Sequence, residues 1–250
     1  MRTVGVDLAA EPAKTAVAVI DWAAGEATVT SLTIGASDEQ ILRMATGAER
    51  IGVDAPFGWP DAFVKFVAAH HDHHAPATRL ATRDDRRPMT KRHTDVVVQA
   101  TTGAVPLSVS ADRIAHVALR CAGLLAEFRA TGVDVDRVGG KVCEVYPAAA
   151  LRMWQMASKG YKGNGAVGFD ALVYAIESAV PWLVLGEFRP LFASNDDAFD
   201  AVVSALIARA VALGRTAMPT VDDGPVAARE GWIHVPTCSL DALVAGTFQP

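Results

Sequence analysis

The chain opens with the stretch Thr3-Val4-Gly5-Val6-Asp7-Leu8-Ala9, which is rich in β-forming residues and contains one charge. This composition predicts a strand that begins almost at the first residue. An ionised carboxylate within a strand is unfavourable unless it is hydrogen-bonded, paired with a cation or bound to a metal. Asp7 is therefore a residue for which a partner has to be found elsewhere in the chain.

The segments that follow predict a mixed sheet around this strand. Two β-branched runs, 15–21 and 27–34, come after short turn-like connections, and such connections join antiparallel neighbours. A helix is expected over 37–47, followed by a buried strand over 50–55 that Pro56 ends. A strand reached through a helix is normally parallel to its neighbour. We therefore expect three antiparallel strands followed by parallel strands.

The second half of the chain adds helices and one further strand. Apolar spacing predicts amphipathic helices over 111–131 and 196–213, with a strand at 141–146 between them. The run 231–235 is a candidate for a last short strand. The predicted fold class is α/β, a mixed five-stranded sheet with helices on both faces. We expect a single domain over 1–250.

Composition excludes several classes of protein. The chain has 250 residues, of which 51% are hydrophobic, and 23 Lys and Arg against 28 Asp and Glu give a net charge of −5. Disorder and charge-driven coating of nucleic acid are therefore not expected. The apolar runs are far shorter than the roughly 20 residues of a membrane span, so no membrane partner is expected. Three cysteines without a CxxC pair and a start without signal-peptide features indicate a cytoplasmic protein.

Two segments interrupt the regular pattern. Residues 70–95 show little apolar periodicity, and we interpret 70–110 as a long basic loop or flap. A loop of this length within a compact domain is usually functional. A helical insert is expected at about 150–190, with the glycine-rich loop 161–165 in it.

Four aspartates are placed where strand ends and a helix start would meet. Asp54 ends the strand over 50–55, and Asp197 and Asp200 lie three residues apart, on one face of the last long helix. If the first and fourth strands are adjacent, Asp7 and Asp54 converge, and a helix packed across that edge would add the other pair. Such carboxylates need cations, and Mg²⁺ or Mn²⁺ prefer hard oxygen ligands. Two ions about 3.5–4 Å apart would activate water against a phosphodiester.

Each aspartate also has an ordinary structural explanation. Asp7 could be a hydrogen-bonded strand residue, and Asp54 could belong to a turn after a strand, although both explanations are less favoured than the functional one. Asp197 is explained by the preference for negative charge in the first turn of a helix. The joint arrangement of the four residues is what favours a metal site.

Five motifs in order carry a resemblance to a known family. They are Val-Gly-Val-Asp-Leu-Ala (4–9), Val-Asp-Ala-Pro-Phe-Gly-Trp-Pro (53–60), Glu-Val-Tyr-Pro-Ala-Ala (144–149), Asp-Asp-Ala-Phe-Asp-Ala (196–201) and Glu-Gly-Trp-Ile-His-Val-Pro (230–236). The chain resembles the domain-of-unknown-function 429 family of predicted nucleases, within the ribonuclease H-like superfamily. The acidic helix is similar to that of RuvC-type Holliday-junction resolvases. Those enzymes have Glu at the fourth-strand position, where this chain has Asp54.

The resemblance implies a ribonuclease H-like fold and a two-metal nuclease acting on DNA or RNA. Asp7 would bridge both metal ions, and Asp54 with Asp197 or Asp200 would complete their ligands. Glu144 is a further acidic candidate, although a strand-end carboxylate bonded to backbone explains it equally well. A RuvC-like enzyme acting on a symmetric junction would be a homodimer.

Basic residues provide candidates for phosphate binding. Arginine binds phosphate through two parallel hydrogen bonds, and the candidates are Arg83, Arg86, Arg92 and Lys162. The alternative is a solvated segment whose arginines pair with neighbouring aspartates.

The sequence leaves three other hypotheses open. An actin- or hexokinase-like ATP-dependent kinase would also place an Asp in its first hairpin, but it needs two similar lobes. A catalytically inactive ribonuclease H-like binding module would keep the same acids. The cluster His70, His71, His73 and His74 suggests zinc, but no further ligand motif completes a site.

Overall fold

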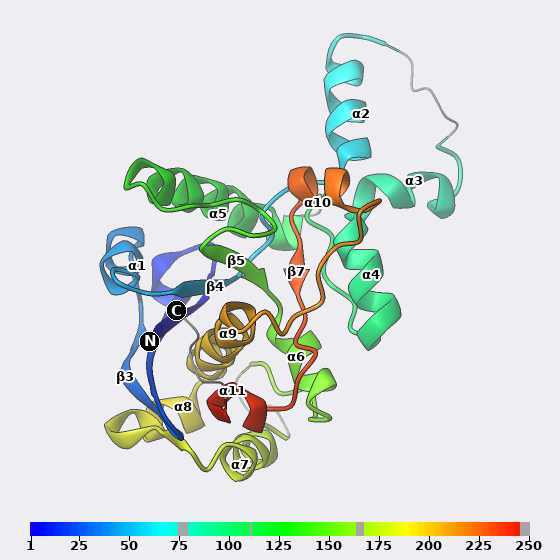
Figure 1. The fold of residues 1–250 in the computed structure, drawn as a ribbon. Coiled ribbons are helices and arrows are strands. Elements are labelled where there is room, and N and C mark those ends of the chain that lie inside the picture. Colours follow the sequence, from blue (N-terminus) through cyan, green and yellow to red (C-terminus); the bar gives the residue numbers. More distant parts are fainter. Residues whose placement is uncertain (75–79, 111, 164–167, 246–250) are drawn as a thin grey trace.

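The computed structural model describes residues 1–74, 80–110, 112–163 and 168–245, and it is organised around one mixed sheet (Figure 1). The strand order is β6-β3-β2-β1-β4-β5-β7. β1, β2 and β3 are antiparallel, and β4, β5 and β7 continue in parallel on the other side of β1, as expected. The strands are β1 (Arg2–Asp7), β2 (Ala16–Ala23), β3 (Glu26–Ile34), β4 (Arg50–Asp54), β5 (Val142–Val145), β6 (Leu183–Val184) and β7 (Ile233–His234).

The expectation of five strands is wrong, because the sheet has seven. The additional strands are β6 and β7, which form its two edges and have two residues each. A two-residue strand is too short to show alternation in the sequence, which is why β6 gave no signal. β7 falls within the candidate run 231–235.

Helices cover both faces of the sheet, as expected. One face packs against α9 together with α6, α7 and α8, and the other packs against α1 and α5 (Figure 1). Among the described residues, no helix combines the length and apolar character needed to cross a membrane. The helices are α1 (Asp38–Met44), α2 (Asp61–His71), α3 (Arg83–Thr90), α4 (His93–Thr102), α5 (Asp112–Ala130), α6 (Pro147–Met153), α7 (Phe169–Ala179), α8 (Arg189–Ser194), α9 (Asp196–Ala212), α10 (Gly224–Glu230) and α11 (Asp241–Ala245), with 3₁₀ turns at Pro12–Lys14 and Gly186–Phe188.

Two glycines allow α9 to lie directly on the central strands. Gly5 of β1 and Gly52 of β4 are paired in register. A Cβ atom on Gly52 would lie 2.6 Å from the backbone oxygen of Ser204, and one on Gly5 would overlap the backbone oxygen of Ala201. Any larger residue would push the helix away from the sheet. The first turns of α9 are thereby held over the ends of β1 and β4.

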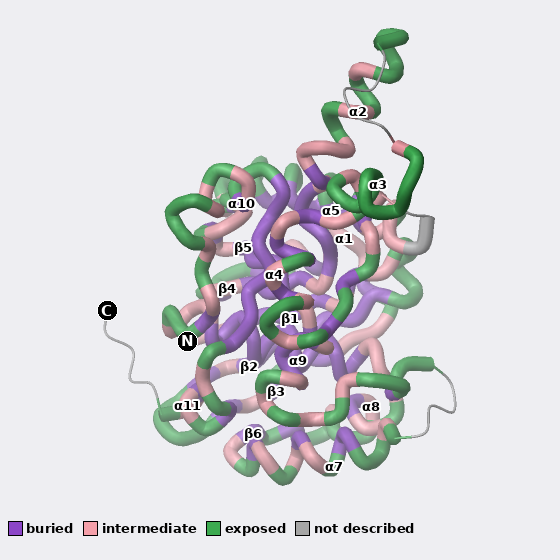
Figure 2. The backbone as a smooth tube through the Cα atoms, turned by 90° about the vertical axis from the view of Figure 1, so that its right-hand side faces the viewer, coloured by how far each residue is buried: buried purple, intermediate pink, exposed green. Residues whose placement is uncertain are grey.

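The segment 70–110 is not the long loop that its composition suggested. Its described part contains the end of α2, all of α3 and α4, with residues 75–79 outside the described residues. α2 and α3 stand away from the body, and neither helix has a buried residue (Figures 1 and 2). Helices that bury nothing need no apolar stripe, so periodicity could not reveal them. α3 begins instead at a capping box made by Thr82 and Asp85.

The segment 150–190, where a helical insert was predicted, combines helices with irregular stretches in its described part. It contains the end of α6 and the whole of α7, and it also supplies the edge strand β6. Residues 164–167, which include part of the glycine-rich loop, lie outside the described residues.

Candidate active site

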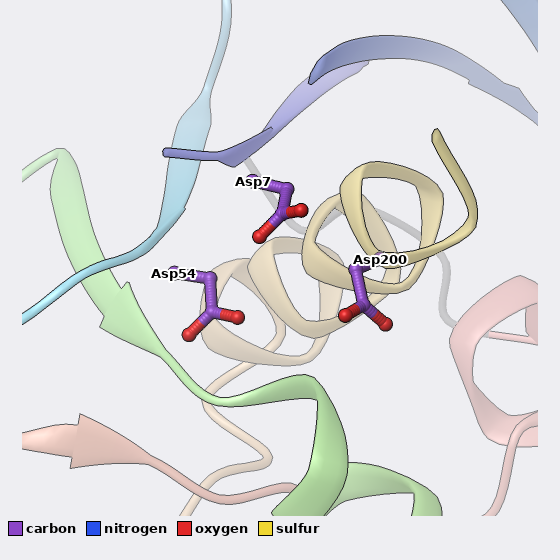
Figure 3. A group of neighbouring side chains, drawn as sticks. All are labelled: Asp7, Asp54 and Asp200. Atoms are coloured by element: carbon purple, nitrogen blue, oxygen red, sulfur yellow. The ribbon is translucent and has the colours of Figure 1, made fainter. Parts of the chain in front are cut away.

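Three carboxylates converge at the edge of the sheet where β1 and β4 end. Asp7 and Asp54 are paired residues of these parallel strands, so both lie at the same edge. Asp200, in the second turn of α9, faces them (Figure 3). Each residue offers an oxygen that lies within 4.8 Å of the other two. The convergence that the sequence suggested is thus present for Asp7, Asp54 and Asp200, here called the aspartate triad.

The triad follows from a short pattern that occurs in both strands. β1 contains Gly5-Val6-Asp7 and β4 contains Gly52-Val53-Asp54. Residues two apart in a strand share a face, so each glycine and its aspartate lie on the side of α9. The side chain of Asn195 accepts a hydrogen bond from the Ala198 backbone at 2.8 Å and fixes where the helix begins. Because the glycines have no side chain, α9 packs directly on the strands, and its first turns lie beside the aspartates.

The triad contains more negative charge than its surroundings offset. Burial raises the pKa of Asp54 to about 7, and the charges on Asp200 and Glu144 add to this effect. Burial, reinforced by the other aspartates, likewise raises the pKa of Asp7 well above its ordinary value. The pKa of Asp200 is also raised, again chiefly by burial. A divalent cation bound here would remove this electrostatic cost.

Two residues from the segment before α7 contact Asp200. The hydroxyl of Tyr161 donates to Oδ1 of Asp200 at 2.9 Å, and Nζ of Lys162 forms an ion pair with Oδ2. Burial would lower the pKa of Lys162, but the charges on Asp200, Asp7 and Asp54 outweigh it and raise the pKa well above its ordinary value. Lys162, a predicted phosphate ligand, therefore remains a cation beside the triad.

Asp197 lies next to the triad without being one of its members. It is one turn before Asp200 and close enough to Asp7 for a hydrogen bond between the two carboxyl groups, which lowers its pKa. Burial and the charge on Asp196 have the larger effect, so the net pKa is raised. Spacing alone predicted that Asp197 and Asp200 share a face; the structure shows that Asp200 is the one gathered with Asp7 and Asp54.

Glu144 lies one strand further along, and its carboxylate already has partners. It is paired with Val53 across β4 and β5. Arg92 donates to both of its oxygens at 2.7 and 2.9 Å, and the Phe57 backbone donates to Oε2 at 3.1 Å. Arg92 is 2% exposed and also bonds Asp95 at 2.9 Å. The structure thus places the predicted phosphate ligand Arg92 in an internal network with Glu144 and Asp95, here called the arginine network.

The remaining candidates lie away from the triad. Arg83 and Arg86 are on α3, and Arg86 donates to the backbone oxygens of Leu80 and Ala81 at 2.6 and 3.0 Å. The zinc reading has no support within the described ranges, where the triad forms the candidate metal group and no histidine joins it. His70 stacks on Phe66, with ring centroids 5.7 Å apart.

A cavity of about 420 Å³ opens beside the triad. Asp7, Asp54 and Lys162 are among its charged lining residues, and its apolar lining includes Leu107, Val117 and Tyr146. Sequence reasoning assigned no role to Tyr146 or Tyr161, although both lie within segments that it had singled out, 144–149 and 161–165. The arrangement can hold a cation and leave space next to it for an organic group.

One of three comparisons with known proteins found a match, and it supports the family named in the sequence analysis. No curated protein and no solved structure matches the chain. The model of one family, described as a protein of unknown function (DUF429), matches residues 5–224. The match covers well over half of the chain and includes all of the aspartate triad. The chain therefore belongs to the DUF429 family.

Proposed function

We propose that this protein is a Mg²⁺- or Mn²⁺-dependent nuclease of the ribonuclease H-like superfamily, which hydrolyses phosphodiester bonds in nucleic acid. The observation that carries the proposal is the aspartate triad, whose oxygens lie within 4.8 Å of one another beside a cavity. The order of three antiparallel strands followed by parallel strands is consistent with that superfamily.

The residues present fit a divalent cation. Three carboxylates are the hard oxygen ligands that Mg²⁺ and Mn²⁺ prefer, and their pKa values, raised chiefly by burial, are ones that a bound cation would lower. Bound ions of this kind supply an activated water and stabilise a leaving oxygen. Asp7, Asp54 and Asp200 would hold the cation, and Tyr161 would orient Asp200 through its hydroxyl. Lys162 would lie where negative charge develops on the phosphate.

The first test is calorimetric titration of Mn²⁺ into the metal-free protein and its Asp7→Asn variant at neutral pH. We expect saturable binding that the variant loses, because the substitution removes a charged oxygen ligand but keeps its shape. Asp222→Asn is the matched control, since Asp222 is exposed and does not line the cavity. Circular dichroism should show that both variants keep the fold.

The second test measures hydrolysis in the presence of Mn²⁺. The substrates are bis(p-nitrophenyl) phosphate and single-stranded and duplex nucleic acid. We expect the hydrolysis rate of Asp7→Asn to fall by more than about 100-fold. A residue that only supports a metal ligand changes activity by at most about that factor, so a larger loss indicates a ligand. Asp222→Asn should retain the wild-type rate. Undiminished hydrolysis by Asp7→Asn would contradict the proposal.

One observation favours a second candidate, the catalytically inactive binding module. Both oxygens of Asp200 already have partners, in Tyr161 and Lys162. In such a module the ammonium group of Lys162 would serve permanently as the cation of the site. Absence of saturable Mn²⁺ binding by the wild type would favour this reading over the nuclease.

A further inference from the structure

The cavity beside the triad is lined by two chemically different kinds of residue. Its volume, about 420 Å³, lies within the range of about 300–1,000 Å³ that is typical of small-ligand sites. Its charged lining residues are Asp7 and Asp54 of the triad, Lys162, and the paired Arg92 and Glu144. Its apolar lining includes Leu107, Ile114, Val117 and Tyr146, here called the apolar wall. A ligand that fills the whole cavity therefore needs an anionic or metal-binding part and an apolar part.

The apolar wall is accessible to a ligand and is held in place. Leu107 is 50% exposed, although it is a large apolar residue that lines a cavity. Lys91 donates to the backbone oxygen of Pro106, and Ser110 donates to that of Met89 at 2.9 Å. These bonds tie both sides of Leu107 to the end of α3. A wall that is already positioned loses little conformational entropy when a flat apolar group packs against it.

The cavity has few charges available for a polyanion. Its cations among the described residues are Arg92 and Lys162. Arg92 is bound to Glu144 and Asp95, and Lys162 is paired with Asp200. Duplex binding depends on several phosphate contacts made by Lys and Arg, and this lining does not offer them. Recognition here has to come from the apolar part of the ligand.

We propose that the cavity is a binding site for one unpaired nucleotide, whose base packs against Leu107, Val117 and Tyr146 while its phosphate lies at the triad. The inference rests on the proposed function for the position of the phosphate. A nucleobase has apolar faces and is covalently linked to an anionic phosphate, so one nucleotide supplies both parts that the lining calls for. A base stacked within a duplex cannot enter a pocket without leaving the stack. The substrate class is therefore single-stranded nucleic acid or a free nucleotide.

Binding with Ca²⁺ tests this without requiring hydrolysis, since carboxylates also bind Ca²⁺. Fluorescence anisotropy would be measured with labelled single-stranded decanucleotides of DNA and of RNA, each compared with its own duplex. The expected result is tighter binding of a single strand than of its duplex. Duplex binding that is equal or tighter for both DNA and RNA would overturn the inference.

The Leu107→Ala variant tests the wall itself. Removing part of a half-exposed leucine should weaken single-strand binding about five- to tenfold. Leu119→Ala is the matched control, because Leu119 is 61% exposed on the same helix as Val117 and does not line the cavity. Equal affinities of Leu107→Ala and the wild type would overturn the inference.

Two further measurements separate the possible sources and the possible failures. Competition by a nucleoside monophosphate at similar concentration would support the pocket and identify a free nucleotide as its ligand. If the nucleoside monophosphate does not compete and only the decanucleotide binds, the result would support the pocket and identify single-stranded nucleic acid as its ligand. Failure to hydrolyse bis(p-nitrophenyl) phosphate with Mn²⁺ would count against the nuclease, while the anisotropy of Leu107→Ala would still decide the pocket.

Discussion

Two groups of carboxylates lie side by side at the ends of adjacent strands, and they differ in how completely they are neutralised. The aspartate triad lies at the ends of β1 and β4, and Glu144 of the arginine network lies on the neighbouring β5. In the network, every oxygen of Glu144 and Asp95 accepts a hydrogen bond from Arg92. In the triad, the ion pair found within the described residues is the one between Lys162 and Asp200.

The difference teaches that position at a strand end does not decide the role of an acid. Glu144 has the geometry of a site residue and lines the same cavity, yet its partners make it part of the framework. Burial raises the pKa values of the triad and of Glu144 alike, so the difference lies in their partners: Arg92 binds both oxygens of Glu144, whereas the ion pair of Lys162 is made with Asp200. Uncompensated charge next to a cavity is the feature that distinguishes a candidate site.

The largest expected effect is on the arginine network. Arg92→Met should lower the free energy of unfolding by about 3–5 kcal/mol, because it leaves two buried carboxylates without their cation. Urea denaturation measures the change. The control is Arg43→Met, which removes an exposed pair with Glu39 at 3.9 Å and should change stability by less than about 0.5 kcal/mol. A loss below about 1 kcal/mol for Arg92→Met would mean that the network is not a structural unit.

An intermediate effect is expected where α9 lies on the sheet. Gly5→Ala should destabilise the protein by about 1–3 kcal/mol, since its Cβ would overlap the Ala201 backbone. Because the helix must move away from β1, we also expect weaker Mn²⁺ binding in calorimetry. Gly123→Ala within α5 meets no atom within 4 Å and should instead stabilise by about 0.5–1 kcal/mol. Unchanged metal affinity in Gly5→Ala would show that this contact does not position Asp200.

The smallest expected effect compares the same chemical change in the two groups. The pKa of Asp54 is raised from 3.8 to about 7, so the folded state binds this proton more tightly than the unfolded state. The corresponding stability is complete below pH 3.8 and is lost as the pH rises through about 7. At pH 8 without metal, Asp54→Asn should therefore stabilise the protein by about 1–2 kcal/mol, which allows for partial solvent screening.

Glu144→Gln should have the opposite sign at the same pH. It removes the charge that Arg92 binds, so we expect a loss of about 1–3 kcal/mol. Thermal unfolding of both variants between pH 5 and pH 8 gives the comparison. If both variants shift stability in the same direction, the distinction between the two groups is wrong.

The centre of the fold could be predicted from the sequence, and its periphery could not. β1, β4 and α9 have strong local patterns, and their convergence followed from the rule for parallel strands. The edge strand β6 and the helix α3 have too few buried residues to leave such a pattern. The repeated Gly-Val-Asp at 5–7 and 52–54 was a usable signal for the docking of α9 that residue-by-residue reasoning passed over.

The roles of individual charged residues depended on distant partners. Arg92 and Glu144 are 52 residues apart, and nothing local in the sequence indicates their contact. The same holds for Tyr161 and Asp200, which are 39 residues apart. Spacing selected a group of acids of which Asp7, Asp54 and Asp200 come together, but contacts made by the fold separated Asp200 from Asp197 and Glu144 from the triad.

The glycine-mediated contact between β1 and α9 has a consequence for the time at which the site forms. β1 is the central strand, yet the helix that covers it is synthesised about 190 residues later. At about 5–20 residues per second, a ribosome needs roughly 10–40 s to pass from Asp7 to Asp200. During that interval, the side of β1 on which Gly5 lies is not packed against α9. The three carboxylates cannot meet before this delay has passed, so the chain completes most of its sheet before it can acquire its acidic site.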